Sequence, residues 1–175
     1  PHEMIVQWFE ERKKGNKVPL NEIKVVFLGD GEAGKSHTIA RLLNDGGDPI
    51  EYTDGATPGI VIKNKEYELD DRKIQVHFWD FGGQEILHSM HRIFLTERTL
   101  YVVLVNARDE TQDARARYWL HNIKSFAPKA RVLLVLNKID QNPNAKVNER
   151  DLKYKYETLY ATIRPIDQPA ITSEI

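Results

Sequence analysis

The chain has 175 residues, in which 25 Lys and Arg face 26 Asp and Glu to give a net charge of −1. This balance excludes the strongly basic field that is typical of a nucleic-acid-binding domain. The absence of cysteine excludes a disulfide framework, a zinc ribbon and thiol chemistry. No segment approaches the ~18 consecutive apolar residues of a membrane span. We therefore expect a soluble, cytoplasmic protein with one globular domain.

The first residues, 1–20, are expected to lie outside this domain. Residues 1–4 lack the features of a signal peptide and are interpreted as the remnant of a tag. Residues 4–14 have the period of an amphipathic helix, and Gly15-Asn16 is a typical helix stop. Two interpretations stay open, a helix that packs on its own domain and a linker helix from a larger protein. The folded domain is expected over residues 21–175.

Beyond residue 20, segments with strand and helix patterns alternate. Short apolar runs predict strands over 23–28, 60–69, 73–79, 99–105 and 131–136, with a tight hairpin at Asp70-Asp71. Helical periods predict helices over 35–44, 85–95, 112–126 and 148–162, and residues 170–172 are expected to begin a last strand. This alternation predicts an α/β fold with a mostly parallel six-stranded sheet flanked by helices. Ligands of such sheets bind at the carboxyl ends of the strands.

A glycine-rich loop follows the first predicted strand and opens the first predicted helix. Its sequence matches the P-loop pattern of nucleotide-binding proteins. Glycines let backbone N–H groups surround a phosphate, and the helix N-terminus adds a positive dipole. The Lys35 ammonium is expected to reach the β- and γ-phosphates, and the Ser36 hydroxyl to bind Mg²⁺. The loop predicts a P-loop NTPase without choosing between GTP and ATP. The expected ligand contacts are Gly29, Asp30, Gly31, Glu32, Ala33, Gly34, Lys35, Ser36 and His37.

A second segment, Asp-Phe-Gly-Gly-Gln, follows the third predicted strand. Its carboxylate, Asp80, is placed to support Mg²⁺. An N–H group near Gly83 is expected to bond the γ-phosphate, and Gln84 to orient the attacking water. In the polar loop before the second strand, Thr57 is expected to offer its hydroxyl to Mg²⁺, with Thr53 as the alternative. Such contacts exist only while the γ-phosphate does, so the loop is expected to act as a switch.

A third segment, Asn137-Lys138-Ile139-Asp140, follows the strand over 131–136. Guanine presents two donors on one edge, N1–H and an exocyclic amine, and one carboxylate, Asp140, can accept both. Two roles stay open for Asn137, a bond to the base edge and a bond to the phosphate loop. The Lys138 stem can lie along the purine face. Ser173, in Thr-Ser-Glu, is expected to offer a backbone N–H to the guanine O6.

At these residues the chain resembles the Ras-like small GTPase superfamily, across roughly residues 22–173. It is more closely similar to the Roc (Ras of complex proteins) domain of Roco proteins, the class that contains the leucine-rich-repeat kinases. Ras and Rab proteins usually have Thr-Ala-Gly-Gln where this chain has Phe-Gly-Gly-Gln. The segments that carry the closer resemblance are 77–86, His88, His91, 94–96 and 118–120.

The resemblance implies a fragment of a bacterial or archaeal-type Roco protein. Leucine-rich repeats would precede the domain and a COR dimerisation domain would follow it, which allows a homodimer. Residues 4–14 would then connect to the repeats. Ras-like domains carry one more helix after the last base-binding loop, whereas this chain stops at Ile175, so a truncated or rearranged C-terminus is expected.

The expected function is a guanine-nucleotide switch that binds GTP and GDP with Mg²⁺ and slowly hydrolyses GTP. Slow turnover is expected because no arginine is marked as a finger in cis, although Arg92, Arg98 and Arg108 lie nearby in sequence. Three alternatives stay open: a non-catalytic guanine-nucleotide scaffold or dimerisation module, an ATP-dependent kinase, and a Rab-like GTPase. No cysteine is present for prenylation, so no direct membrane anchor is expected. His88 and His91 lack a nearby third zinc ligand, and a structural or partner-facing role is expected for them.

Overall fold

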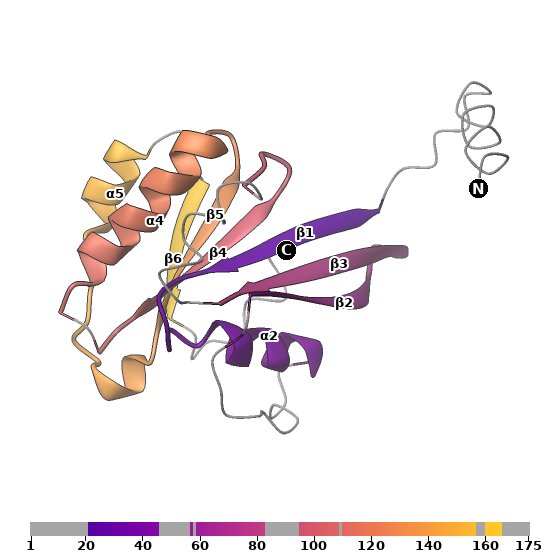
Figure 1. Cartoon of the computed structure of the whole chain (residues 1–175), viewed down its shortest axis with the longest axis horizontal. Coiled ribbons are helices and arrows are strands. Elements are labelled where there is room, and N and C mark those ends of the chain that lie inside the picture. The colour runs from indigo at the N-terminus through magenta and orange to yellow at the C-terminus, as the bar shows by residue number, and fades with distance from the viewer. Residues whose placement is uncertain are drawn as a thin grey trace, which may run out of the picture.

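The computed structural model describes residues 21–45, 57, 59–82, 95–108, 110–156 and 160–165. Within these ranges the backbone forms a six-stranded sheet in the order β2-β3-β1-β4-β5-β6, as Figure 1 shows. The expected α/β class with a mostly parallel sheet is confirmed. The elements are β1 (Glu22–Leu28), α2 (Lys35–Leu43), β2 (Ile60–Leu69), β3 (Arg72–Phe81), β4 (Leu100–Asn106), α4 (Gln112–Phe126), β5 (Arg131–Asn137), the 3₁₀ turn η2 (Ile139–Gln141), α5 (Glu149–Lys155) and β6 (Tyr160–Pro165).

The central strands are parallel, and the described helices α2, α4 and α5 lie between strands in the chain. β1 pairs in parallel with β3 and β4, and β5 pairs in parallel with β4 and β6. β4 is buried from Tyr101 to Val105, which is the near-continuous apolar pattern expected of a strand covered on both faces. Only the pairing of β2 with β3 is antiparallel within the described sheet.

The β2–β3 hairpin turns at Asp70-Asp71, as the sequence predicts. Both residues have positive φ, 50° and 59°. A two-residue turn with two left-handed residues follows the right-handed twist of the strands, and aspartate tolerates this conformation better than most residues. The hairpin is ten residue pairs long, from Ile60 opposite Phe81 to Leu69 opposite Arg72.

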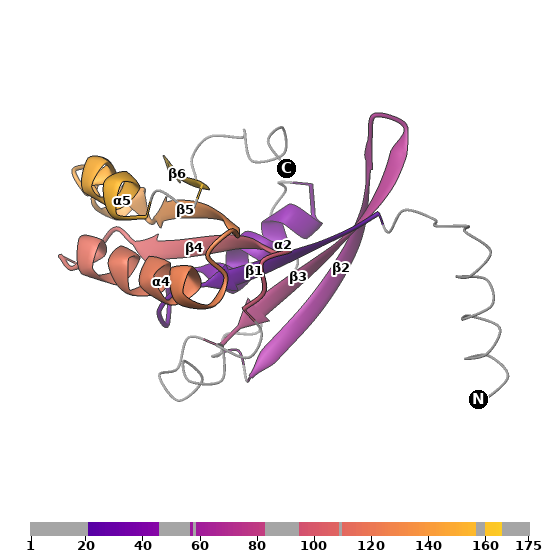
Figure 2. The same cartoon turned by 90° about the horizontal axis from the view of Figure 1, so that it is seen from above.

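Two apolar clusters lie on opposite faces of the sheet, beneath the helices that flank the strands in Figure 2. One cluster joins β4 and β5 to α4 and α5, and its α4 members are Ala116, Trp119, Leu120 and Ile123. The other joins β1 and β3 to α2, through Ile39. The helix expected over 112–126 is confirmed with the same bounds. Helices therefore cover both faces, and the connecting loops are left at the strand ends.

The prediction of one helix over 148–162 is wrong. α5 ends at Lys155, and residues 160–165 form β6, which pairs in parallel with β5. Helical period continues through Leu159 in the sequence, but an unpaired β5 edge would leave backbone donors and acceptors without partners. Tertiary pairing overrides the local period there. The helices expected over 4–14 and 85–95, and the strand expected from 170, lie outside the described residues.

Candidate functional site

The three predicted motifs meet at one edge of the sheet. β1, β3 and β5 run in the same direction, so the segments that follow them emerge on the same side, at the left in Figure 1. In the strand register Phe27 lies beside Asp80, and Asn106 lies beside Asn137. The fold therefore brings together residues that are more than 100 positions apart, as the sequence analysis expects for an open parallel sheet.

Two glycines of the phosphate loop are required by their surroundings. Gly29 has a φ of 145°, and a Cβ there would lie 2.4 Å from the Leu104 carbonyl oxygen. Gly34 has a φ of 94°, and a Cβ there would lie 2.3 Å from Asn137 Nδ2. Both positions combine left-handed backbone with close packing, so a side chain would displace the neighbouring strand loop. The loop backbone is thus held close to β4 and to the last residue of β5.

Lys35 curls back over the phosphate loop. Its Nζ donates to the carbonyl oxygens of Gly29 at 2.9 Å and Asp30 at 2.8 Å. Burial lowers the pKa of Lys35, and the nearby carboxylates of Asp80 and Asp30 oppose that shift. The two carbonyl oxygens are neutral acceptors. A phosphate bound in the loop would give this desolvated ammonium an anionic partner.

Ser36, Thr57 and Asp80 gather their oxygen atoms at one point. Ser36 Oγ lies 2.9 Å from Thr57 Oγ1, and Thr57 Oγ1 lies 3.5 Å from Asp80 Oδ2. Asp80 is buried, and in the part of the chain that the structure describes its Oδ1 has no hydrogen-bond partner. Burial raises the pKa of Asp80, while the Ser36 hydroxyl and the ammonium groups of Lys35 and Lys63 oppose the rise.

This oxygen cluster fits a hard divalent cation. Two hydroxyls and a carboxylate are the ligand types that Mg²⁺ prefers, and it completes its shell with water and phosphate oxygens. The unpartnered Oδ1 of Asp80 is an acceptor that a cation or one of its waters would satisfy. Thr57, which the sequence favours over Thr53, makes this contact, whereas Thr53 lies outside the described residues.

The base-reading segment is tied to the phosphate loop. Asn137 Nδ2 donates to the Ala33 carbonyl at 2.8 Å, and Asn137 Oδ1 accepts from the Lys138 N–H at 2.9 Å. Of the two roles left open for Asn137, the structure has the bond to the loop. Lys138 has a positive φ of 61°, and the exposed Asp140 follows it in η2. The carboxylate that would read guanine therefore faces solvent.

Side chains from α4 and from the end of η2 brace this edge, and their role was not predicted from the sequence. The Ala107 carbonyl accepts from Gln112 Nε2 and from Asn142 Nδ2, both at 2.9 Å, and the Ala107 N–H donates to the Asn137 carbonyl at 2.8 Å. Gln112 is a buried polar residue at the start of an apolar helix face, which is the only sequence signal of this role. A second brace is an ion pair between Arg115 Nε and Asp30 Oδ2 at 3.1 Å.

Four predicted site residues or alternatives remain as sequence predictions. Gly83, Gln84, Ser173 and Thr53 lie outside the described residues, as do His88 and His91. The other phosphate-loop residues, including the exposed Gly31, Glu32 and His37, lie at the carboxyl edge as expected.

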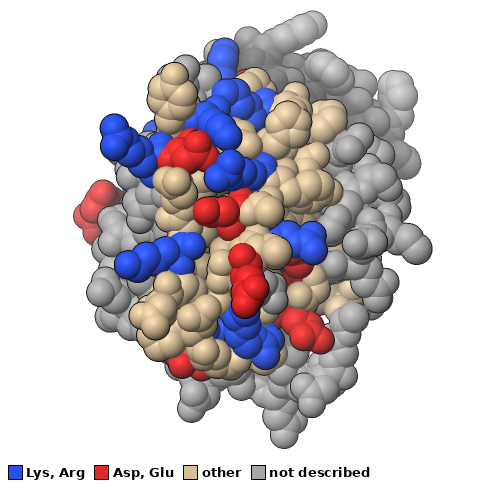
Figure 3. Space-filling view, turned by 90° about the vertical axis from the view of Figure 1, so that its left-hand side faces the viewer, with Lys and Arg blue, Asp and Glu red and all other residues tan. Residues whose placement is uncertain are grey.

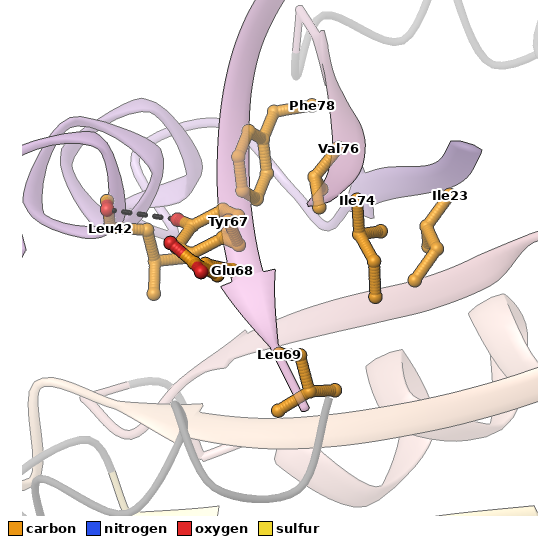
Figure 4. A pocket seen from close by; sticks show the side chains of 8 residues that line it. All are labelled: Ile23, Leu42, Tyr67, Glu68, Leu69, Ile74, Val76 and Phe78. Carbon is orange, nitrogen blue, oxygen red and sulfur yellow. Dashed lines mark hydrogen bonds between the residues drawn. The ribbon is translucent and has the colours of Figure 1, made fainter. Parts of the chain in front are cut away.

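An apolar hollow lies away from this edge, between α2 and the far end of the β2–β3 hairpin (Figure 4). Ile23, Leu42, Leu69 and Phe78 contribute to its lining. Tyr67 also lines it and donates to the Leu42 carbonyl at 3.1 Å. Leu69 sits at the hairpin turn, whereas Asp80 lies at the opposite end of β3. The hollow is therefore separate from the polar site.

Comparison with known proteins places these features in one family. The model of the family described as "Ras of Complex, Roc, domain of DAPkinase" matches residues 24–140, more than half of the chain. A solved structure of Methanosarcina barkeri Roco2 RocCORdC bound to GDP is 41% identical and superposes with a TM-score of 0.69, over 85% of this chain and 44% of that one.

Curated relatives match over a similar span. "Probable serine/threonine-protein kinase pats1" of Dictyostelium discoideum is 31% identical over 70% of this chain and 4% of its own length. Rab-like protein 2B of Homo sapiens is 28% identical over 69% of this chain and 51% of its own length. The chain therefore spans about half of the small relatives and a small part of the large one. No helix in the described ranges is long and apolar enough to cross a membrane.

Proposed function

The chain belongs to the Roc family of Ras-like GTPase domains, and from that premise we propose that it is a guanine-nucleotide switch. It binds GDP and GTP with Mg²⁺ and slowly hydrolyses GTP to GDP. The observation that carries this proposal is the meeting of three groups at one sheet edge. They are the Lys35 ammonium, the oxygen cluster of Ser36, Thr57 and Asp80, and the segment from Asn137 to Asp140.

The phosphate loop would hold the β- and γ-phosphates. Gly29 and Gly34 keep the backbone in left-handed conformations that only glycine adopts without strain, and the N-terminus of α2 begins at Lys35. Lys35 would exchange its two carbonyl partners for phosphate oxygens. That exchange replaces neutral acceptors by anionic ones, which attract the ammonium through a full opposite charge.

Ser36, Thr57 and Asp80 are the residues that would hold Mg²⁺, directly or through its waters. When bound, the metal supplies positive charge beside the phosphoryl group that is transferred. The shared hydrogen bonds of the three side chains keep them within reach of one another. Thr57 belongs to the loop before β2, so its bond to Ser36 couples that loop to the nucleotide. This coupling supports the proposed switch role of the loop.

The base would be read by Asp140, which accepts from the two guanine donors, while Asn137 fixes the segment to the phosphate loop through Ala33. Lys138 would lie along the purine face. Ser173 would add a backbone N–H to O6. Adenine lacks the paired donors, so an adenine nucleotide would leave the Asp140 carboxylate without hydrogen-bond partners. The loss of these hydrogen bonds would discriminate strongly against ATP and ADP.

Hydrolysis would proceed by in-line attack of water that Gln84 orients, with a nearby N–H at Gly83 on the γ-phosphate. Lys35 and the loop N–H groups would stabilise the charge that develops on the leaving oxygens. Intrinsic turnover would be slow, since fingers supplied by a partner contribute about 10³–10⁵ in rate. The similarity to the Roco2 RocCORdC structure supports a COR domain as a partner in the whole protein. Leucine-rich repeats, a homodimer and a cytoplasmic location are proposed from the family resemblance alone.

A competition titration tests the proposal. Labelled GDP is displaced from the purified chain in Mg²⁺ by unlabelled GDP, GTP or ATP, and single-turnover conversion of GTP is followed by chromatography. We expect displacement by both guanine nucleotides, none by ATP at equal concentration, and slow release of phosphate. Equal displacement by ATP would contradict the base-reading role of Asp140. Guanine binding without any turnover would favour the non-catalytic scaffold instead.

A further inference from the structure

The phosphate loop carries a net charge of the wrong sign for a loop that binds a polyphosphate. Between Gly29 and Ser36 it has two carboxylates, Asp30 and Glu32, and one ammonium, Lys35. A carboxylate that faces the phosphates would repel them. The face of the molecule in Figure 3 shows Lys and Arg together with Asp and Glu over its described part. A cation beside one of these carboxylates would offset its charge.

Asp30 is close enough to the binding groups to matter. Its carbonyl accepts from Lys35 Nζ at 2.8 Å, and its carboxylate acts to raise the pKa of Lys35 against the effect of burial. The Asp30 charge therefore reaches the ammonium that would meet the phosphates. If that carboxylate turned toward Lys35, it would compete with the nucleotide for the same cation.

Arg115 meets this carboxylate from the other side. Its Nε lies 3.1 Å from Asp30 Oδ2, and the two side chains are 50% and 24% exposed. Arg115 belongs to the first turn of α4, where its N–H donates to the Thr111 carbonyl at 3.0 Å. The buried Ala116 anchors this turn, and Gln112 ties it to Ala107. The guanidinium is thus carried by a well-fixed helix end.

We propose that Arg115 is a positioning residue of the phosphate loop, which holds the Asp30 carboxylate on the α4 side and neutralises its charge. The electrostatic potential at the phosphates is then dominated by Lys35 and the loop N–H groups. The inference rests on the proposed function, since it assigns a determinant of nucleotide affinity. It gives α4 an indirect part in binding, because Arg115 acts through Asp30.

Arg115→Gln tests the proposal in the full chain. Because an exposed ion pair is worth up to ~1 kcal/mol, the affinity for labelled GDP is expected to fall about three- to five-fold at low salt. The loss should be larger for GTP, which has one more phosphate. It should shrink toward 1 M salt, where charges are screened beyond ~3 Å. The matched control is Arg117→Gln, on the same helix, which pairs with Asp151 at 3.0 Å instead. It should leave GDP affinity unchanged.

A double-mutant cycle separates charge from packing. In an Asp30→Asn background the carboxylate is gone, so Arg115→Gln is expected to change GDP affinity by less than about two-fold. If Arg115 only anchored α4, its loss would be equal in both backgrounds and insensitive to salt, and the proposal would be overturned. Failure of the parent chain to bind GDP would overturn the proposed function, and this inference with it. Circular dichroism checks that each variant folds.

Discussion

The phosphate side and the base side of the site are built in different ways. On the phosphate side the polar groups already hold one another, with Lys35 on two backbone carbonyls and Ser36 on Thr57. On the base side, Asp140 is exposed. A ligand must therefore exchange internal hydrogen bonds at the phosphate end, whereas the base meets a carboxylate that faces water. The phosphate end is preorganised by burial, and the base end is preorganised by its backbone.

One side-chain amide joins the two sides. Asn137 Nδ2 reaches the Ala33 carbonyl, and the same nitrogen lies where a side chain at Gly34 would fall. Through this contact, a movement of the segment from Asn137 to Asp140 would also move the phosphate loop. We expect changes at the phosphate end to affect both nucleotides and all bases, and changes at Asp140 to affect base choice.

Lys35→Ala gives the largest expected loss. It removes a cation that would make charge-assisted bonds to two phosphates, each worth about 1.5–3 kcal/mol. GTP affinity should fall by at least about 100-fold, and the same should hold for inosine and xanthosine triphosphates. GDP keeps only the β-phosphate of the two and should lose less. Titration with labelled nucleotides measures it. Lys73→Ala, an exposed lysine paired with Glu66 in the far half of the hairpin, is the control. Binding within a few-fold of the parent would remove Lys35 from the site.

Asp140→Asn is expected to change base choice more than phosphate affinity. The amide loses a charged acceptor for the two guanine donors, so GDP affinity should fall about ten- to one-hundred-fold. Xanthosine diphosphate, which offers an acceptor where guanine has its amine, should gain affinity in the variant. Competition of the two diphosphates for the parent and the variant measures this exchange. An equal loss for both would place Asp140 in the scaffold and not at the base.

Gly34→Ala should break the link between the two sides. A Cβ there would lie 2.3 Å from Asn137 Nδ2, on backbone with a φ of 94°. The left-handed strain costs about 1–2 kcal/mol, and displacement of Asn137 adds to it. Urea unfolding and GDP release rates measure the effect, with about ten-fold faster release expected.

Gly59→Ala is the matched control for that change. Gly59 has a φ of 70°, but no atom of the described residues lies within 4 Å of its added Cβ. The Gly59→Ala variant should lose stability in urea from backbone strain alone, and its GDP release rate should equal that of the parent. Equal effects of the two substitutions on release would mean that Asn137 does not couple the phosphate and base sides.

The phosphate side could be predicted from the sequence better than its bracing. The P-loop and Asp80 lie at the ends of strands with clear apolar runs. Their glycines, lysine and carboxylate are the residue types that phosphate and Mg²⁺ require. The Arg115–Asp30 pair joins two ordinary charged residues, and only the path of α4 brings them together. Likewise β6 follows from the pairing needs of β5, whereas the helical period of the residues before it predicts a longer helix. A sequence therefore predicts the residue types of a local binding motif, but it does not predict contacts between residues that only the topology brings together.

The smallest expected effect is a pH dependence that Asp80 gives to the metal-free protein. Burial raises the pKa of Asp80, so the folded state binds the proton more readily than the unfolded state does. Stability should therefore be higher at acidic pH. It should fall as pH rises from the ordinary aspartate pKa through the raised value, and stay flat above it. This is the reverse of the slope from a salt-bridged carboxylate.

Asp80→Asn isolates that contribution, because the amide has no acid proton and keeps the size of the side chain. In EDTA, the difference in urea midpoint between parent and variant should narrow as the pH is lowered, since protonation removes the unfavourable buried charge of the parent. With Mg²⁺ present, the parent should instead become less stable relative to the variant as the pH is lowered. The reason is that the metal binds the carboxylate form of Asp80 and competes with the proton. A difference that does not vary with pH in EDTA would mean that solvent, and not burial, sets the Asp80 charge. The phosphate side would then be as open as the base side.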